Sequence, residues 1–158
     1  MKRLALVGLT TTMIMGLVGL TGMAKPQDAG QGSNEERGRV CDAGTLKGDY
    51  GMSLSGTRPG VGGAPEQFVG ISMQTYDGHG NFTQTDNNHG PSGTATDLPG
   101  WGTYTVNPDC TGTKTLWVQG LPFPIENRLV VVDKGDELRL AVMAPAPIIV
   151  AGVGRRVR

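Results

Sequence analysis

Glycine and proline recur about every eight to twelve residues from residue 40 onward, and this spacing limits the possible folds more than any other feature of the sequence. The segments between them alternate apolar and polar side chains or are short and β-branched, which is typical of strands. No helical period continues beyond a turn or two. The pattern predicts eight strands, at residues 46–56, 67–76, 81–88, 100–106, 113–120, 125–133, 137–143 and 148–157.

Tight turns join these strands in sequence order. Asp77-Gly78 separates two extended runs and is a strong hairpin signal, and Lys134-Gly135-Asp136 makes a second short connection. Eight short antiparallel strands must bury one face against a second sheet or close on themselves, and closure removes the exposed edges. We therefore expect an all-β fold, a closed eight-stranded antiparallel up-and-down barrel, with a two-sheet β-sandwich as the alternative.

Residues 1–24 have the order of a secretory signal peptide. Lys2 and Arg3 precede a long apolar run, and the small residues Gly22 and Ala24 stand at the positions that signal peptidase requires. A membrane anchor is the alternative, but glycines interrupt the apolar run. We expect cleavage after Ala24 and export to the periplasm or the medium.

Composition divides the rest of the chain in two. Residues 25–39 hold almost no apolar side chain, so we expect a disordered spacer there and a barrel domain at 40–158. The whole chain has 14 basic and 14 acidic residues, and removal of the signal peptide leaves 12 basic residues against 14 acidic ones. A nearly neutral chain is not expected to bind nucleic acid, nor a membrane after signal cleavage. The sequence predicts no oligomeric state.

The chain contains two cysteines, Cys41 before the first strand and Cys110 in the turn between the strands at 100–106 and 113–120. In an exported chain two cysteines most simply pair with each other. A reactive thiol is the alternative, but the neighbouring carboxylates of Asp42 and Asp109 would raise a thiol pKa. We expect a structural disulfide between Cys41 and Cys110.

Four segments also resemble a family of small, largely uncharacterised exported bacterial proteins. They are CDAGTLKGDYG, YDGHGNFT, GTYTVNPDCTGT and VVVDKGDELRLAVMAPAPIIVAGVGRR, and together they lie within residues 41–156. The piece Tyr-x-Val-x-x-Asp-Cys-x-Gly is fairly specific. The resemblance implies a barrel similar to that of allene oxide cyclases and, more loosely, of lipocalins. It implies no catalytic residue, because the shared pattern consists of glycines, turn residues and cysteines.

Residue patterns for common chemistry are weak. His79 and His89 are the only histidines, and their spacing matches no metal-binding motif. No serine lies in a nucleophile turn, and Asp49 and Glu126 are expected to point outward. The glycine-rich stretch at 58–65 lacks the lysine and helix of a phosphate-binding loop. We expect no metal site, no cofactor and no catalytic residue that the sequence can identify.

The barrel lumen is the remaining candidate site. An eight-stranded barrel is wide enough to be filled by side chains or to hold one small ligand, and both interpretations stay open. Strand alternation suggests that six large side chains face inward and could contact a ligand: Tyr50, Met52, Tyr104, Trp117, Leu129 and Met143.

Three functions follow from these two interpretations. An open lumen predicts an exported module that binds a small apolar or amphipathic molecule, or a cyclase- or isomerase-type barrel enzyme that acts mainly by positioning its substrate. A filled lumen predicts a structural or surface-interaction protein. No inward Asp, Glu or His can be assigned to the middle of a strand, which favours binding over catalysis.

The first prediction concerns export. If residues 1–24 are a signal peptide, the mature protein begins at Lys25. N-terminal sequencing of protein recovered from the periplasm or medium of the host tests this expectation. A chain that still begins at Met1 in a membrane fraction would contradict it.

Overall fold

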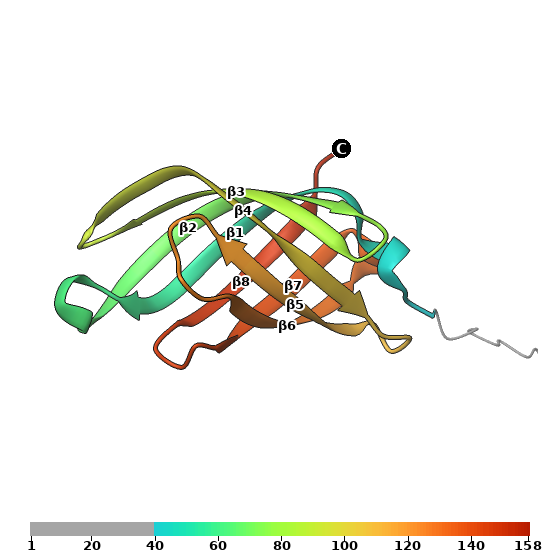
Figure 1. Cartoon of the computed structure of the whole chain (residues 1–158). Coiled ribbons are helices and arrows are strands. Elements are labelled where there is room, and N and C mark those ends of the chain that lie inside the picture. Colours follow the sequence, from blue (N-terminus) through green and yellow to red (C-terminus); the bar gives the residue numbers. More distant parts are fainter. Residues whose placement is uncertain (1–39) are drawn as a thin grey trace, which may run out of the picture. The chain divides into compact units, whose positions relative to one another are not determined.

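Eight antiparallel strands close into a barrel in sequence order in the computed structural model, which describes residues 40–158 (Figure 1). The signal peptide expected at 1–24 and the spacer expected at 25–39 lie outside the described residues. The strands are β1 (Lys47–Pro59), β2 (Pro65–Asp77), β3 (Asn81–Gly90), β4 (Gly93–Val106), β5 (Thr111–Val118), β6 (Ile125–Val132), β7 (Glu137–Ala144) and β8 (Ile149–Arg156). Three short 3₁₀ helices are η1 (Ala43–Leu46), η2 (Val61–Gly63) and η3 (Asp133–Gly135).

Strand β1 closes the barrel because it pairs with both β2 and β8. Tyr50, for example, lies opposite Gln74 on one side and Arg156 on the other. The sheet therefore has no free edge, which confirms the predicted barrel and excludes the β-sandwich. Every predicted strand is present, and the largest difference is in β4, which begins at Gly93 whereas the prediction began at residue 100.

The two ends of the barrel differ. Strands β1, β2 and β4 have 13, 13 and 14 residues, whereas β5 to β8 have 8 each, so the hairpins β1–β2 and β3–β4 project beyond the rest (Figure 1). We call this end the mouth; it carries the β1–β2, β3–β4, β5–β6 and β7–β8 connections. The opposite end, which carries η1, η3 and the other connections, is the base.

Two glycines on β8 let large side chains of β1 enter the interior. A Cβ atom at Gly154 would lie 2.1 Å from Met52 Sδ, and one at Gly152 would lie 2.5 Å from Leu54 Cδ2. Gly102 on β4 has another role, because its missing Cβ would lie 1.9 Å from the Thr115 carbonyl oxygen on β5. The strand glycines therefore permit close approach between neighbouring strands, as a small barrel requires.

Aromatic side chains fill the base half of the interior. Tyr76 packs edge-on against Tyr50 and Tyr104, with ring centroids 5.4 and 5.0 Å away, and stacks on Phe82 at 5.5 Å. These four residues are buried, and we call them the aromatic plug. Leu46, the last residue of η1, is fully buried in the same cluster. In this half, the interpretation that side chains fill the barrel is correct.

Local hydrogen bonds fix η1 under the plug. Asp42 caps this helix, since its side chain accepts from the Thr45 backbone N–H at 3.1 Å while the Thr45 hydroxyl accepts from the Asp42 N–H at 3.0 Å. The Tyr104 hydroxyl donates to the Ala43 carbonyl oxygen at 2.9 Å. The chain is therefore held against the base before the first strand begins.

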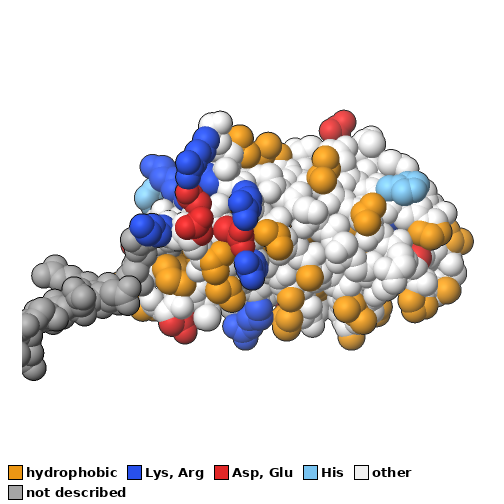
Figure 2. Space-filling view, turned by 180° about the vertical axis from the view of Figure 1, so that it is seen from behind, with side chains coloured by type: hydrophobic (Ala, Val, Ile, Leu, Met, Phe, Trp, Pro, Cys, Tyr) orange, Lys and Arg blue, Asp and Glu red, His pale blue; other side chains and the backbone are white. Residues whose placement is uncertain are grey.

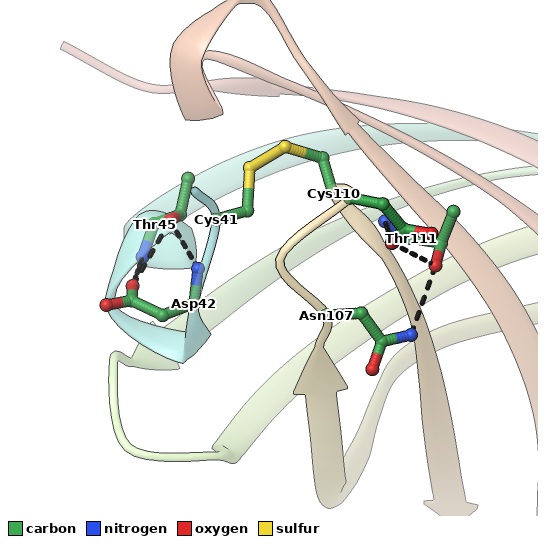
Figure 3. The surroundings of a disulfide bond; sticks show 7 residues. Cys41, Asp42, Thr45, Asn107, Cys110 and Thr111 are labelled. Carbon is green, nitrogen blue, oxygen red and sulfur yellow. Dashed lines mark hydrogen bonds between the residues drawn. A yellow bond between two sulfur atoms is a disulfide. The ribbon is translucent and has the colours of Figure 1, made fainter. Parts of the chain in front are cut away.

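The predicted disulfide is present and holds this segment in place (Figure 3). Cys41 and Cys110 are bonded, with their Cα atoms 5.0 Å apart and a sequence separation of 69. Cys110 lies in the turn that follows Asn107, with a positive φ of 66°. The Cys41 N–H also donates to the Pro108 carbonyl at 3.3 Å. The bond thus ties the segment before η1 to the β4–β5 turn.

Arg156 connects the remaining parts of the base. Its guanidinium donates to the carbonyl oxygens of Thr45 at 3.1 Å and Gly135 at 2.9 Å, and it pairs with Asp136 at 3.3 Å. The same group lies 4.9 Å from the ring centroid of Tyr50. The last strand, η1, η3 and the plug therefore meet at one side chain.

The second prediction concerns the disulfide. Replacing both Cys41 and Cys110 by Ser should lower the free energy of unfolding by about 2 to 5 kcal/mol. Without the bond the unfolded chain is no longer closed into a long loop and gains conformational entropy. Urea unfolding of the wild type with and without reductant, beside the double variant, measures this loss. Two thiols that alkylate freely in the native protein without reductant would contradict the bond.

Candidate functional site

A cavity of about 860 Å³ occupies the mouth half of the barrel. Residues of all four mouth connections line its rim, among them Val61, Ser92, Leu121 and Pro147. This volume is in the range of small-molecule binding sites. Its walls are mainly apolar and come from nearly every strand: Leu54, Phe68, Leu98, Leu116, Val118, Ile125, Leu140, Val142 and Val150.

Five buried polar side chains lie at the inner end of this cavity, and we call them the polar floor. They are Gln74, Gln84, Asp86, Lys114 and Asn127. All five line the cavity, and two of them also contact the aromatic plug: Gln74 accepts a hydrogen bond from the Tyr76 hydroxyl at 2.7 Å, and Lys114 lies over the Phe82 ring. The floor therefore separates the filled base from the open mouth.

A chain of hydrogen bonds runs across the floor. The Lys114 ammonium donates to Gln74 Oε1 at 2.7 Å, and Gln74 Nε2 donates to Gln84 Oε1 at 2.9 Å. Gln84 Nε2 in turn donates to Asp86 Oδ2. The two amides thus connect a buried cation to a buried carboxylate that is not in direct contact with it. Each amide is oriented by the bonds it makes, so the network has one direction of donation.

Lys114 is the most unusual member of the floor, because its side chain is 1% exposed. Besides Gln74, its ammonium donates to the Tyr76 hydroxyl at 3.3 Å and lies 4.0 Å from the Phe82 ring centroid. No carboxylate within the described residues lies at ion-pair distance from it. Burial lowers the pKa of Lys114 to about 7, against the attraction of the negative charge on Asp86.

Asp86 is perturbed in the complementary direction. Burial raises the pKa of its carboxyl group, while the neighbouring Ser72 hydroxyl, the Gln84 amide and the positive charge of Lys114 reduce that rise. Ser72 lies opposite Asp86 in the β2–β3 register. Neither Ser72 Oγ nor Asp86 Oδ1 has a hydrogen-bond partner at ordinary distance, although both atoms are buried. Ser72 therefore supplies the hydroxyl beside this carboxylate, and neither atom is exposed to the cavity.

An ion pair stabilises the rim where the two long hairpins meet. Arg58 pairs with Glu66 at 3.0 Å and donates to Asn88 Oδ1 at 2.8 Å, and its guanidinium lies 5.3 Å from the Phe68 ring centroid. Glu66 also accepts a hydrogen bond from the Ser92 N–H at 3.0 Å. These contacts link β1 and β2 to the β3–β4 hairpin and fix this side of the mouth.

On the face that Figure 2 shows, most charged side chains gather at the base, with both signs mixed. Glu137 pairs there with Arg139 at 2.8 Å and with Arg155 at 2.9 Å. Hydrophobic side chains are spread over the rest of the face that Figure 2 shows. The surface therefore has no patch of one sign on this face, and the two charged groups whose ionised forms burial disfavours, Lys114 and Asp86, are inside the barrel.

The structure corrects the expected orientation of two candidate residues. Trp117 on β5 is 39% exposed and Met143 on β7 is 55% exposed, so both point outward. From the sequence we expected Trp117 to face the interior of the barrel from β5, whereas Leu116 and Val118 do so in the structure. Because side chains alternate along a strand, this choice also turns Lys114 inward.

The other four candidates are buried, but none of them lines the cavity: Tyr50, Met52, Tyr104 and Leu129. They belong to the core around the aromatic plug. The expectation that no acidic residue points inward from mid-strand is wrong, because Asp86 does so from β3. The signal that could have found it is the alternation of Phe82, Gln84 and Asp86, which share one face.

Neither histidine lies in the floor. His79 is exposed in the β2–β3 turn, as expected, whereas His89 belongs to β3 and not to a loop, with its Nδ1 atom 2.8 Å from Thr94 Oγ1. Within residues 40–158, no three His, Cys, Asp or Glu side chains are placed to hold a metal ion. Over the same range, no helix is long and apolar enough to cross a membrane.

No protein-family model, curated protein or solved structure matches this chain. The resemblance to small exported bacterial barrel proteins therefore stays a prediction. The candidate site rests on the geometry of the cavity and its floor.

The third prediction follows from the buried lysine. Between about pH 7.5 and 9.5 the unfolded chain binds one proton more than the folded chain at Lys114, because the folded pKa is about 7 and the ordinary value is 10.5. The free energy of unfolding should therefore rise with pH, by at most about 1.4 kcal/mol per pH unit. Urea unfolding at a series of pH values should show this slope in the wild type and in Lys47→Met, and its loss in Lys114→Met.

Lys47 is a suitable control because its side chain is exposed on β1. A slope that is the same in the wild type and in Lys114→Met would show that Lys114 has an ordinary pKa in the folded protein.

Proposed function

We propose that this protein is an exported binding module that holds a small amphipathic molecule in its barrel. The observation that supports this function best is a cavity of about 860 Å³ with apolar walls over a buried polar floor. The walls would enclose an apolar body, and the floor would receive a polar end. The Cys41–Cys110 disulfide is compatible with an oxidising compartment outside the cytoplasm.

The division of the barrel interior supports binding over a purely structural role. The aromatic plug and Leu46 close the base, and the same core continues into the cavity wall through Leu116, Val118 and Leu140, beyond which the mouth half stays open. A protein with a filled barrel would gain stability from larger side chains at the cavity wall, where this chain has Val118, Val142 and Val150. A purely structural barrel would also have no use for the polar floor. Burial of Lys114 and Asp86 costs stability, and this cost is explained if the floor orients a ligand.

The apolar wall of the cavity is large enough to bury a small hydrocarbon ligand, and the binding free energy can be calculated from the methylene groups buried. Each buried methylene group contributes roughly 0.8 kcal/mol, so a chain of about ten carbons supplies about 8 kcal/mol before ordering costs. That sum sets a lower limit of about 1 µM on the dissociation constant, because the costs of association and ordering weaken binding. An apolar molecule of this size would occupy only part of the cavity.

The fourth prediction tests occupancy of the cavity. Diphenylhexatriene, an uncharged hydrocarbon that fluoresces in apolar surroundings, should bind with a dissociation constant on the order of 1 µM. Val142→Trp places bulk inside the cavity and should weaken binding at least about tenfold, while Met143→Trp places the same bulk outside and should not. Fluorescence titration measures both, and thermal unfolding checks that each variant is folded.

The two substitutions are adjacent on β7 and differ mainly in the face they occupy. Equal effects of Val142→Trp and Met143→Trp on probe binding, or no binding to the wild type, would contradict the proposed function.

A cyclase- or isomerase-type enzyme is the second candidate, and the floor gives one observation in its favour. Lys114 and Asp86 both line the cavity, and their pKa values are shifted toward each other. Pairs of this kind are common among catalytic acids and bases. To distinguish the two functions, a molecule extracted from protein of the native host is added to fresh protein. A binding module leaves the molecule unchanged. An isomerase converts it to a product of equal mass and different chromatographic retention time.

A further inference from the structure

We propose that Asn127 is the residue that determines ligand specificity, and that its Oδ1 atom accepts a hydrogen bond from an uncharged donor group of the bound molecule. The inference rests on the proposed binding function and specifies the chemical class of the ligand. Three features support it: the hydrogen bonds that the other floor side chains already make, the fixed direction of the Asn127 amide, and its position beside the apolar wall.

Most polar atoms of the floor are already bonded or enclosed. Gln74 and Gln84 each use both the oxygen and the nitrogen of the amide within the network. The Lys114 ammonium makes two hydrogen bonds. Asp86 Oδ2 accepts from Gln84, and Asp86 Oδ1 is enclosed. A ligand therefore has to find its polar contact at the fifth floor residue, Asn127.

Asn127 Oδ1 differs from the enclosed oxygen of Asp86. The Asn127 side chain lines the cavity and is 5% exposed. Its Oδ1 accepts no hydrogen bond from residues 40–158, and over the same range only Ser72 Oγ and Asp86 Oδ1 are enclosed without a partner. Asn127 Oδ1 therefore keeps accessible surface. Because Asn127 faces inward from β6, that surface opens into the cavity.

Two backbone carbonyl groups fix the direction of the Asn127 amide. Its Nδ2 donates to the carbonyl oxygens of Ile125 at 3.1 Å and Lys114 at 3.3 Å. Rotating the amide by half a turn would bring Oδ1 against these two oxygens, which is repulsive because all three atoms are acceptors. The nitrogen is therefore held at the barrel wall, and the cavity meets the oxygen. A ligand that donates satisfies this acceptor, and a ligand that only accepts leaves it unsatisfied.

Asn127 lies where the polar floor meets the apolar wall. It is opposite Lys114 of the floor in the β5–β6 register and opposite Val142 of the wall in the β6–β7 register. Both neighbours line the cavity. A molecule whose apolar body packs against Val142 thus has its polar end beside Asn127.

The charged groups of the cavity favour an uncharged ligand. Arg58 is engaged by Glu66 at 3.0 Å and by Asn88 at 2.8 Å, and the Lys114 ammonium is bonded within the floor. Of the two carboxylates that line the cavity, Glu66 pairs with Arg58, and Asp86 is bonded through one oxygen and enclosed at the other. A charged ligand would therefore be buried without a counter-charge, which is unfavourable.

One open acceptor and no available counter-charge define the ligand class. The ligand has an apolar body and one uncharged hydrogen-bond donor at its polar end, for which a hydroxyl group is the simplest example. An ether of the same size lacks the donor, and a carboxylate brings a charge. These differences can be measured with simple molecules.

The test compares 1-undecanol with its isomer decyl methyl ether, which has the same atoms but no donor, and with undecanoate. Each displaces bound diphenylhexatriene from the wild type. Undecanol should bind roughly fivefold more tightly than the ether, as expected for a hydrogen bond between neutral groups, and more tightly than undecanoate. Equal affinities for the two isomers, or a preference for the ether or undecanoate, would overturn the inference.

Those outcomes leave the proposed function intact, because displacement of the probe itself shows that the cavity is occupied. Failure of diphenylhexatriene to bind the folded wild type would instead count against the proposed function. The two failures are therefore distinguishable in one set of titrations.

Asn127→Leu removes the acceptor and keeps a side chain of similar size. The preference for undecanol over the ether should be lost, while the affinity for diphenylhexatriene changes by less than about twofold. Arg128→Leu is the matched control, since Arg128 is the next residue on β6 and is exposed outside the barrel, and it should keep the full preference. Comparing the ratio of the two dissociation constants between proteins cancels the difference in hydration between the isomers. An unchanged preference in Asn127→Leu would overturn the role of Asn127.

The Nδ2 atom of Asn127 also bonds two backbone carbonyl groups, so thermal unfolding must show that Asn127→Leu is folded. If it is not, nuclear magnetic resonance of the wild type replaces the variant. A hydrogen bond to Oδ1 polarises the amide, so undecanol should shift the Asn127 side-chain NH₂ signals more than the ether does. Equal shifts with the two isomers would overturn the role of Asn127.

Discussion

Closure of the sheet between β1 and β8 is the constraint on which the rest of this structure depends. It satisfies the backbone groups of both edge strands and creates one interior that every inward side chain must share. The aromatic plug fills the half of that interior next to the base, where η1 and the disulfide also lie. The mouth half is lined by smaller aliphatic side chains and keeps its volume. Filled and open interpretations of the barrel are therefore both correct, each for one half.

The boundary between the two halves is where the molecule departs from what stability alone would favour. A buried lysine without a carboxylate at ion-pair distance is unfavourable in a core, and apolar replacements of buried charges often stabilise a protein. Here the Phe82 ring, the Tyr76 hydroxyl and the Gln74 amide offset part of the cost for Lys114. Residues that reduce stability in this way are commonly found at functional sites.

The sequence was sufficient for the fold but not for the site, and the reason lies in the alternation of side chains. Turn signals such as Asp77-Gly78 and the count of strands predicted the barrel, and the positions of Cys41 and Cys110 predicted the disulfide. The face of each strand was harder to predict, because on β5 either Trp117 or the pair Leu116 and Val118 could face inward. We expected the large aromatic side chain of Trp117 to be buried, which is the wrong face of β5. Lys114 shares the other face, so its burial was not predicted.

The position of the floor depends on a turn at the far end of one hairpin. On β2 and β3 the register places Ser72 opposite Asp86 and Gln74 opposite Gln84, so much of the floor stands on two paired strands. The turn that sets this register is held by the Asp77 carboxylate, which accepts from His79 and Asn81 and has its pKa lowered to about 2 by these hydrogen bonds. A shift of one residue would turn every floor side chain on one strand outward. The chemistry of the cavity is therefore specified at the base, by a carboxylate that no ligand would contact.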